Sequence, residues 1–398
     1  MNHGSPWSLD RSLLVVAAAL AVLMLGNCAE STSTRGGVID RCEGGAALPP
    51  PSSTAITGYN PADGVFDPAP TSDECGRVWM SYSAVDNSTS GQRLVHIRIA
   101  QGSAPGWTDA NANVTTSEEY TANPIGPLYG TWQHEVSRLF YDFHTSDPNQ
   151  RWKLIWHRYR WEQATVGSVG SPLFQHGWIS FKTAPNATGP WSAERKLFVG
   201  SAYDTSNNSI IGSPEYHLDT LHPALSGCLV FTEPGMLATL NGVYISLKCA
   251  TGAGGAGNVV LLRCDNQISA GSCGYRGTLL TGPEAANYND TFGVGASNFT
   301  GFSATELVNS GSGNYLLVTP TEGDLYRGCL AFEIVSLDDA TLVRDGSNVA
   351  IARQSVRGTA GSFNGACGQS VGTLGILYSE LFPGQPPQFR IFGSRLSF

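Results

Sequence analysis

Carboxylate side chains recur at comparable places along this chain, each shortly before a strand-like stretch rich in aromatic residues. They are Asp67, Glu135, Glu233 and Glu306, and a fifth such place holds Asn364. Two carboxyl groups that converge in a cleft can cleave a glycosidic bond. One is protonated and donates to the leaving oxygen, while the other is ionised and activates water or attacks the sugar. Mutual repulsion and partial burial would raise the pKa of the acid.

Five repeated units must position these carboxylates. Each unit has a turn residue, a strand rich in apolar and aromatic residues, and then a second strand-like stretch. The first strands are expected at 76–83, 150–159, 241–249, 312–320 and 372–379, and the second at 95–108, 177–191, 258–265, 328–339 and 388–398. Alternating polarity and β-branched or aromatic residues favour strands, and the absence of a long 3.6-residue apolar period predicts little helix.

Five such units predict an all-β fold, a five-bladed β-propeller in a single domain over residues 63–398. The innermost strand of each blade would precede the aromatic strand and line a central axis, so that the carboxylates converge on one funnel. Each blade would bury its faces against its neighbours, which leaves few exposed sheet edges. A β-sandwich or a looser repeat stays open as the alternative.

The N-terminal segment predicts export. Arg11 precedes an uncharged run from Ser12 to Asn27, which has the length of a signal-peptide core and is short for a membrane span. The run ends in LGNC at Cys28, which looks like a bacterial lipoprotein cleavage box, although Asn27 departs from the small residue usual there. We expect a signal peptide over 1–28, of either the lipoprotein or the ordinary type. A Ser/Thr/Gly/Pro-rich linker would follow over 29–62.

The nine cysteines fit an exported protein. If Cys28 is lipidated or removed, the remaining eight allow up to four disulfides. Cys264 with Cys273, and Cys228 with Cys249, are close enough in sequence to staple local hairpins. No CxxC pair is present, which argues against a zinc site or a redox motif. The mature protein is expected to be extracellular, periplasmic or a cell-surface lipoprotein, with membrane attachment only through an N-terminal lipid.

The amino-acid composition indicates which classes of binding partner suit this chain. The formal net charge is −9 and the chain has no basic cluster, so nucleic acid is a poor candidate partner. Low charge with many Trp, Tyr, Asn, Gly and Thr residues suits a surface that binds neutral sugars. We expect a monomer that needs no cofactor and has no metal-ligand motif, although a structural cation in the central channel stays open.

Three stretches resemble the five-bladed furanosidase propellers, especially glycoside hydrolase family 43 (arabinanases, arabinofuranosidases and xylosidases). Asp67-Pro68 stands twelve residues before Trp79, like the family's Asp-Pro opening of blade one. RWKLIWHRYRW, followed by GWISFKTAPNATGPW, resembles a strand pair that ends in a Gly-Pro-Trp turn. TEPGMLATLNGVYISL resembles the family's Glu-Gly-Pro strand followed by Asn-Gly and an aromatic strand.

The resemblance implies roles for three carboxylates. Glu233 would be the general acid and Asp67 the general base, and Glu135 would stand where the family has an Asp that orients the acid and tunes its pKa. Unit three reads Glu-Pro-Gly, and unit two offers Glu in place of Asp, so an altered or lost reaction stays open. Strand alternation would point Glu135 away from the neighbouring Val136, and an ion pair of Glu135 with Arg138 or Arg158 is the alternative to catalysis.

Six further residues are candidates for binding a sugar: Trp132, His134, Trp156, Arg158, Glu306 and Arg327. Trp132 and Trp156, together with Tyr326, could stack on a sugar ring, although aromatic residues on propeller strands belong mostly to the core. The leading hypothesis is an exported glycoside hydrolase that cleaves an arabinan- or xylan-like polysaccharide or oligosaccharide. The alternative is a non-catalytic surface propeller lipoprotein that binds glycan or protein.

Overall fold

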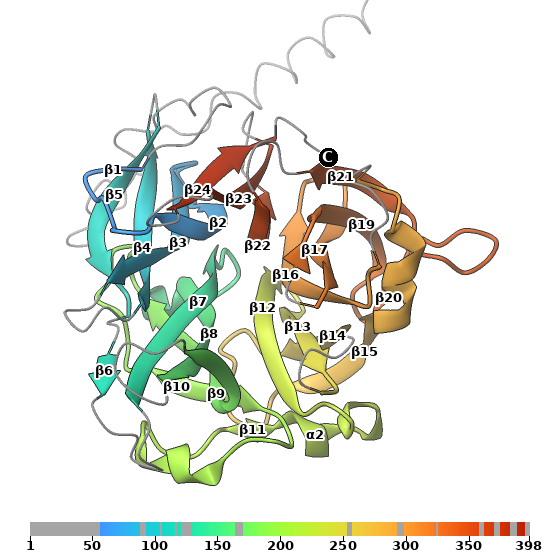
Figure 1. The fold of residues 1–398 in the computed structure, drawn as a ribbon, viewed down its shortest axis with the longest axis horizontal. Coiled ribbons are helices and arrows are strands. Elements are labelled where there is room, and N and C mark those ends of the chain that lie inside the picture. The colour runs from blue at the N-terminus through green and yellow to red at the C-terminus, as the bar shows by residue number, and fades with distance from the viewer. Residues whose placement is uncertain are drawn as a thin grey trace, which may run out of the picture. The chain divides into compact units, whose positions relative to one another are not determined.

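The computed structural model describes residues 56–87, 93–103, 106–115, 118–120, 129–163, 170–252, 257–292, 298–323, 325–357, 362–369, 375–382 and 388–394. They form five sheets around a common centre, a five-bladed β-propeller with little helix (Figure 1), as predicted. The predicted signal peptide and most of the predicted linker lie outside the described residues. The first described strand, β1 (Ile56–Thr57), falls within the predicted linker and pairs with β5 (Gly106–Asn113) of blade 1.

The first three strands of each blade run antiparallel from the centre outward. The strands nearest the centre are β2 (Val65–Ser72), β7 (Tyr129–Tyr141), β12 (Val230–Thr239), β16 (Gly301–Asn309) and β22 (Ser362–Gln369). The second strands are β3 (Val78–Asn87), β8 (Trp152–Gln163), β13 (Gly242–Ala250), β17 (Asn314–Glu322) and β23 (Ile376–Phe382). The third strands are β4 (Arg93–Ser103), β9 (Ser171–Ala184), β14 (Gly257–Cys264), β19 (Gly328–Ser336) and β24 (Gln388–Gly393). The two strands predicted for each unit are therefore the second and third strands of a blade.

Shorter elements complete the blades. The additional strands are β6 (Glu118–Tyr120), β10 (Arg195–Val199), β11 (Tyr216–His217), β15 (Gly274–Leu280), β18 (Leu325–Tyr326), β20 (Thr341–Leu342) and β21 (Ala352–Arg357). The helical segments are η2 (Pro148–Gln150), η3 (Thr205–Ser209), α2 (Leu218–Leu221), η4 (Pro223–Leu225) and η5 (Gly282–Tyr288). No helix in the described ranges is long and apolar enough to cross a membrane.

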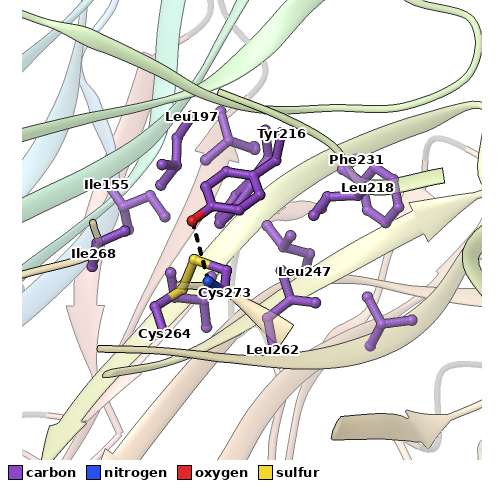
Figure 2. Close-up of a cluster of buried hydrophobic side chains, with 14 of the residues drawn as sticks. Ile155, Leu197, Tyr216, Leu218, Phe231, Leu247, Leu262, Cys264, Ile268 and Cys273 are labelled. Carbon is purple, nitrogen blue, oxygen red and sulfur yellow. Dashed lines mark hydrogen bonds between the residues drawn. A yellow bond between two sulfur atoms is a disulfide. The ribbon is translucent and has the colours of Figure 1, made fainter. Parts of the chain in front are cut away.

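Apolar side chains fill the junctions between neighbouring blades. Where blade 2 meets blade 3, Ile155 and Leu197 belong to one buried cluster with Phe231 and Leu247 (Figure 2). Comparable clusters join blades 1 and 2, blades 3 and 4, blades 4 and 5, and blades 5 and 1. Each blade therefore buries both of its faces, which is how a propeller stabilises sheets that could not fold alone.

Disulfides reinforce this arrangement. The predicted pairs Cys228–Cys249 and Cys264–Cys273 are both present. In Figure 2, the backbone N–H of Cys273 donates to the hydroxyl of Tyr216 at 3.1 Å. A third bond, Cys329–Cys367, joins blade 4 to blade 5, and Cys75 is also disulfide-bonded. Such a set of disulfides is typical of proteins that fold in an oxidising compartment.

The ring closes where blade 5 meets the start of blade 1. The backbone N–H of Phe389 donates to the carbonyl oxygen of Asp63 at 2.8 Å. Gly64 forms an isolated parallel β-bridge with Phe389 and has a φ of +93°. A Cβ atom at this position would lie 2.0 Å from the Phe389 carbonyl oxygen, so the close approach requires glycine. The ring of Phe66 stacks on that of Phe389 with centroids 4.8 Å apart. The closure thus places both rings beside Asp67.

Candidate active site

A β-bulge interrupts the innermost strand of every blade at a corresponding place. The register with the second strand shifts between Phe66 and Ala69, Glu135 and Arg138, Thr232 and Gly235, Ser303 and Glu306, and Asn364 and Gly368. In four blades a bulged residue has a positive φ: Asp67 at 53°, Val136 at 50°, Glu233 at 54° and Ala304 at 53°. Bulges of this kind change the direction of a side chain and are frequent next to active sites.

The bulges of β2, β7 and β12 border a small cavity of about 130 Å³ that three carboxylates line. Asp67 comes from β2, Glu135 from β7 and Glu233 from β12. The remaining lining residues are Phe66, Arg93, Val136, Tyr326 and Phe389. The structure therefore brings together the three carboxylates that the sequence suggested for catalysis.

The bulge in β7 also corrects one expectation about Glu135. Regular alternation would place Glu135 and Val136 on opposite faces of the strand, but both residues line the cavity. The positive φ of Val136 breaks the alternation, and its side chain packs with Ala304 and Ala366. Glu135 consequently keeps its position at the cavity while an apolar contact among blades 2, 4 and 5 forms beside it.

Asp67 is completely shielded from solvent. Its Oδ1 accepts a hydrogen bond from the backbone N–H of Ala366 at 2.7 Å, and its Oδ2 accepts from the N–H of Val136 at 3.1 Å and from the hydroxyl of Ser83 at 3.3 Å. Burial raises the pKa of Asp67 to about 6. The two N–H donors and the charge of Arg138 oppose that rise in pKa, and the charge of Glu233 adds to it.

Glu135 is partly exposed. The burial of the rest of its surface raises its pKa to about 8, and the negative charges of Asp67 and Glu233 contribute to the rise. A hydrogen bond with the side chain of Tyr159 and the positive charge of Arg93 act in the opposite direction. The balance of these effects favours a protonated Glu135 at neutral pH.

Glu233 is also partly exposed, and blade 4 holds its carboxylate. The hydroxyl of Ser303 and the backbone N–H of Ala304 both donate to its Oε2. The hydroxyl of Thr305 donates to the backbone carbonyl of Glu233 at 2.9 Å. These contacts fix the bulge of β12 against β16 and orient the carboxylate at the cavity.

Two further polar residues border the carboxylates. The charge of Glu233 and then burial raise the pKa of the Tyr326 hydroxyl well above its ordinary value, so this group stays protonated and can donate a hydrogen bond. The guanidinium of Arg93 lies over the ring of Phe389, 5.0 Å from its centroid. The cavity therefore combines three carboxylates with one cation, a phenol and two phenylalanine rings.

Four of the other candidates lie inside blade 2 and are not among the residues lining this cavity. Trp132 is buried against Trp178, with ring centroids 5.1 Å apart. The indole N–H of Trp156 donates to Nδ1 of His134 at 3.1 Å, and burial holds the pKa of this histidine well below its ordinary value. Arg158 forms an ion pair with Glu194 at 3.0 Å. The structure thus places these side chains within the core of the blade.

The last two candidates lie elsewhere. Glu306 is buried and lines a different cavity of about 690 Å³, together with Arg138. Arg327 is partly exposed and pairs with Glu322 at 3.9 Å. Its neighbour Tyr326, which sequence analysis considered only for stacking, does reach the carboxylates.

Sequence analysis missed Phe66, Arg93 and Phe389 as residues of the cavity. Phe66 directly precedes Asp67, so adjacency alone could have suggested it. Arg93 begins β4 and Phe389 lies in β24, and only the closure of the ring brings these distant segments together. In the part of the chain that the structure describes, no group of three or more His, Cys, Asp or Glu side chains could hold a metal ion.

Known proteins resemble this chain in structure and not in sequence. No protein-family model matches the chain, and no curated protein sequence matches it. A thermostable family-43 glycoside hydrolase is similar over 87% of this chain and 93% of its own, with 10% identity and a TM-score of 0.47. A family 117 glycoside hydrolase from the marine bacterium Zobellia galactanivorans has 10% identity and a TM-score of 0.44, over 87% of this chain and 91% of its own.

An endo-arabinase from Bacteroides thetaiotaomicron is similar over 88% of this chain and 98% of its own, with 10% identity and a TM-score of 0.43. The five-bladed β-propeller itself rests on the five sheets of this chain.

Proposed function

We propose that this chain is a glycoside hydrolase that cleaves a neutral, arabinan- or xylan-like polysaccharide or oligosaccharide. The observation that carries the proposal is the convergence of Asp67, Glu135 and Glu233 on one cavity. Burial raises the pKa values of Asp67 and Glu135, and the neighbouring negative charges add to the rise. Perturbed carboxyl groups in a cavity are a frequent mark of acid and base catalysis.

The reaction needs one protonated and one ionised carboxyl group at the same glycosidic bond. The surroundings raise the pKa of Glu135 further than that of Asp67, and different pKa values are how a single site supplies an acid and a base at one pH. Resemblance to family 43 assigns the general base to Asp67, the general acid to Glu233 and the orienting role to Glu135. Tyr326 and Arg93 can donate hydrogen bonds to sugar hydroxyls, and Phe66 and Phe389 supply apolar surface.

The volume of the cavity favours binding of one sugar ring between the carboxylates. About 10–15 Å³ of cavity accommodates one water-sized group. A cavity of about 130 Å³ therefore has room for on the order of ten such groups, close to the number of heavy atoms in a pentose. The rest of a polymer would extend away from this cavity.

The test is hydrolysis by the Glu233→Gln variant. With arabinan or xylan oligosaccharides and reducing-end detection, we expect the wild type to release sugar and the variant to lose at least about 100-fold in rate, since a positioned acid or base contributes that much or more. Glu333→Gln is the matched control, because Glu333 is a surface carboxylate paired with Arg353. Both variants should keep the wild-type circular dichroism spectrum. Full activity in folded Glu233→Gln would contradict the proposal and favour a propeller that only binds.

A further inference from the structure

The three carboxylates differ in their exposure to solvent. Asp67 has no contact with solvent, and both of its oxygens already accept hydrogen bonds, from Val136 and Ser83 on one side and Ala366 on the other. Glu135 and Glu233 are both partly exposed at the cavity. A group that exchanges a proton with water or substrate must touch it. By this criterion the two glutamates are the better pair of reacting groups.

Hydrogen-bond donors then distinguish the two glutamates. The Oε2 atom of Glu233 accepts hydrogen bonds from the hydroxyl of Ser303 and the backbone N–H of Ala304. Both of these donors are on Oε2, and among the described residues none donates to Oε1 of Glu233. Its Oε1 therefore keeps its lone pairs for a proton from water.

Glu135 has the opposite surroundings. Tyr159 is its hydrogen-bonding side chain, and the charges of Asp67 and Glu233 face it across the cavity. Arg93 is the one cation among the residues lining the cavity, and Tyr326 remains a neutral phenol there. Arg138 acts on Asp67 from outside the cavity, so three carboxyl groups face two cations. At least one carboxyl group then favours the neutral form, and the one with the fewest donors keeps the proton. The raised pKa of Glu135 agrees with this count.

We propose that Glu135 is the general acid and Glu233 the general base, with Asp67 as a buried anion that positions the bulges. This inference rests on the proposed function and changes the roles that the family resemblance implies. The C–O bond between the anomeric carbon and the leaving oxygen breaks, and that oxygen takes the proton of Glu135. The oxygen of one water bonds to the anomeric carbon, and Glu233 takes its proton. Exchange of one proton with solvent on each residue restores the starting state.

A series of leaving groups tests this assignment. Wild type, Glu135→Gln and Glu233→Gln are compared on arabinofuranosides or xylosides that carry methoxide, 4-nitrophenolate or 2,4-dinitrophenolate leaving groups. An acid matters only when the leaving group needs a proton. We expect Glu135→Gln to lose at least about 100-fold on the methyl glycoside and less than about 10-fold on the dinitrophenyl glycoside. Glu233→Gln should lose about equally on all of them.

The reverse pattern, with Glu233→Gln rescued by the dinitrophenyl leaving group and Glu135→Gln uniformly slow, would overturn the proposal and leave the glycosidase function intact. A wild type inactive on every glycoside would instead reject the proposed function. The Asp67→Asn variant is compared in the same way. If it folds, its rate of hydrolysis should depend on the leaving group as the wild-type rate does. If Asp67→Asn does not fold, the two glutamine variants decide alone.

Discussion

The innermost strands line two cavities of different character. The small cavity, of about 130 Å³, lies at the bulges and gathers three carboxylates around one cation. The larger, of about 690 Å³, lies further along the same strands. There Arg138 accompanies Glu306 and Asp338, and the hydroxyl of Tyr244 donates to Asp338 at 2.7 Å.

The difference shows that volume is a poor guide to chemistry in this protein. In the larger cavity a cation and a phenol stand among the carboxylates, whereas the small cavity keeps three carboxylates together at a cost in stability. Natural proteins retain such costs mainly where function requires them. If the two cavities differ in this way, substitutions at the small cavity should have the larger effects.

Removal of Asp67 should cost the most stability. Asp67→Ala would leave the buried N–H groups of Val136 and Ala366 without an acceptor, at about 1–3 kcal/mol for each unsatisfied group. We expect the free energy of unfolding, measured with urea, to fall by about 3 kcal/mol. Asp338→Ala, at the larger cavity, is half exposed and should cost less than about 1 kcal/mol. Equal losses would remove the contrast between the cavities.

The pH dependence of stability should come partly from Glu135. Its pKa is raised from 4.5 to about 8 on folding, so the folded state binds a proton that the unfolded chain releases. Stability from this group is therefore present below pH 4.5 and is lost as pH rises towards 8. We expect the melting temperature to fall less between pH 5 and pH 8 in Glu135→Gln than in wild type.

Glu333→Gln is the control for that experiment, because its surface ion pair should leave the pH profile unchanged. Parallel curves for wild type and Glu135→Gln would show that Glu135 titrates normally. The charge argument for a proton on Glu135 would then fail.

The smallest effect is expected at the larger cavity. Tyr244→Phe removes one hydrogen bond to Asp338 and should lower the free energy of unfolding by about 0.5 kcal/mol. The rate of glycoside hydrolysis should stay within about twofold of the wild-type rate, since Tyr244 lies outside the carboxylate cavity. A tenfold loss of activity would extend the functional site along the axis.

Much of the fold could be predicted from the sequence because its signals are local. Alternating polarity and turn residues located the second and third strands of all five blades. Short separations along the chain identified the pairs Cys228–Cys249 and Cys264–Cys273. The longer link, Cys329–Cys367, spans 38 residues and could not be chosen among the other pairings.

The candidate site, too, was predicted only in part from the sequence. The position before an aromatic strand indicated Asp67, Glu135, Glu233 and Glu306, and the resemblance to family 43 implied catalytic roles for the first three. Their surroundings needed the tertiary structure: bulges with positive φ redirected the side chains, and ring closure brought Arg93 and Phe389 beside them. The physical reason is that strand periodicity is a property of neighbours in sequence. The charge state of a carboxyl group depends instead on donors, charges and burial contributed by other blades.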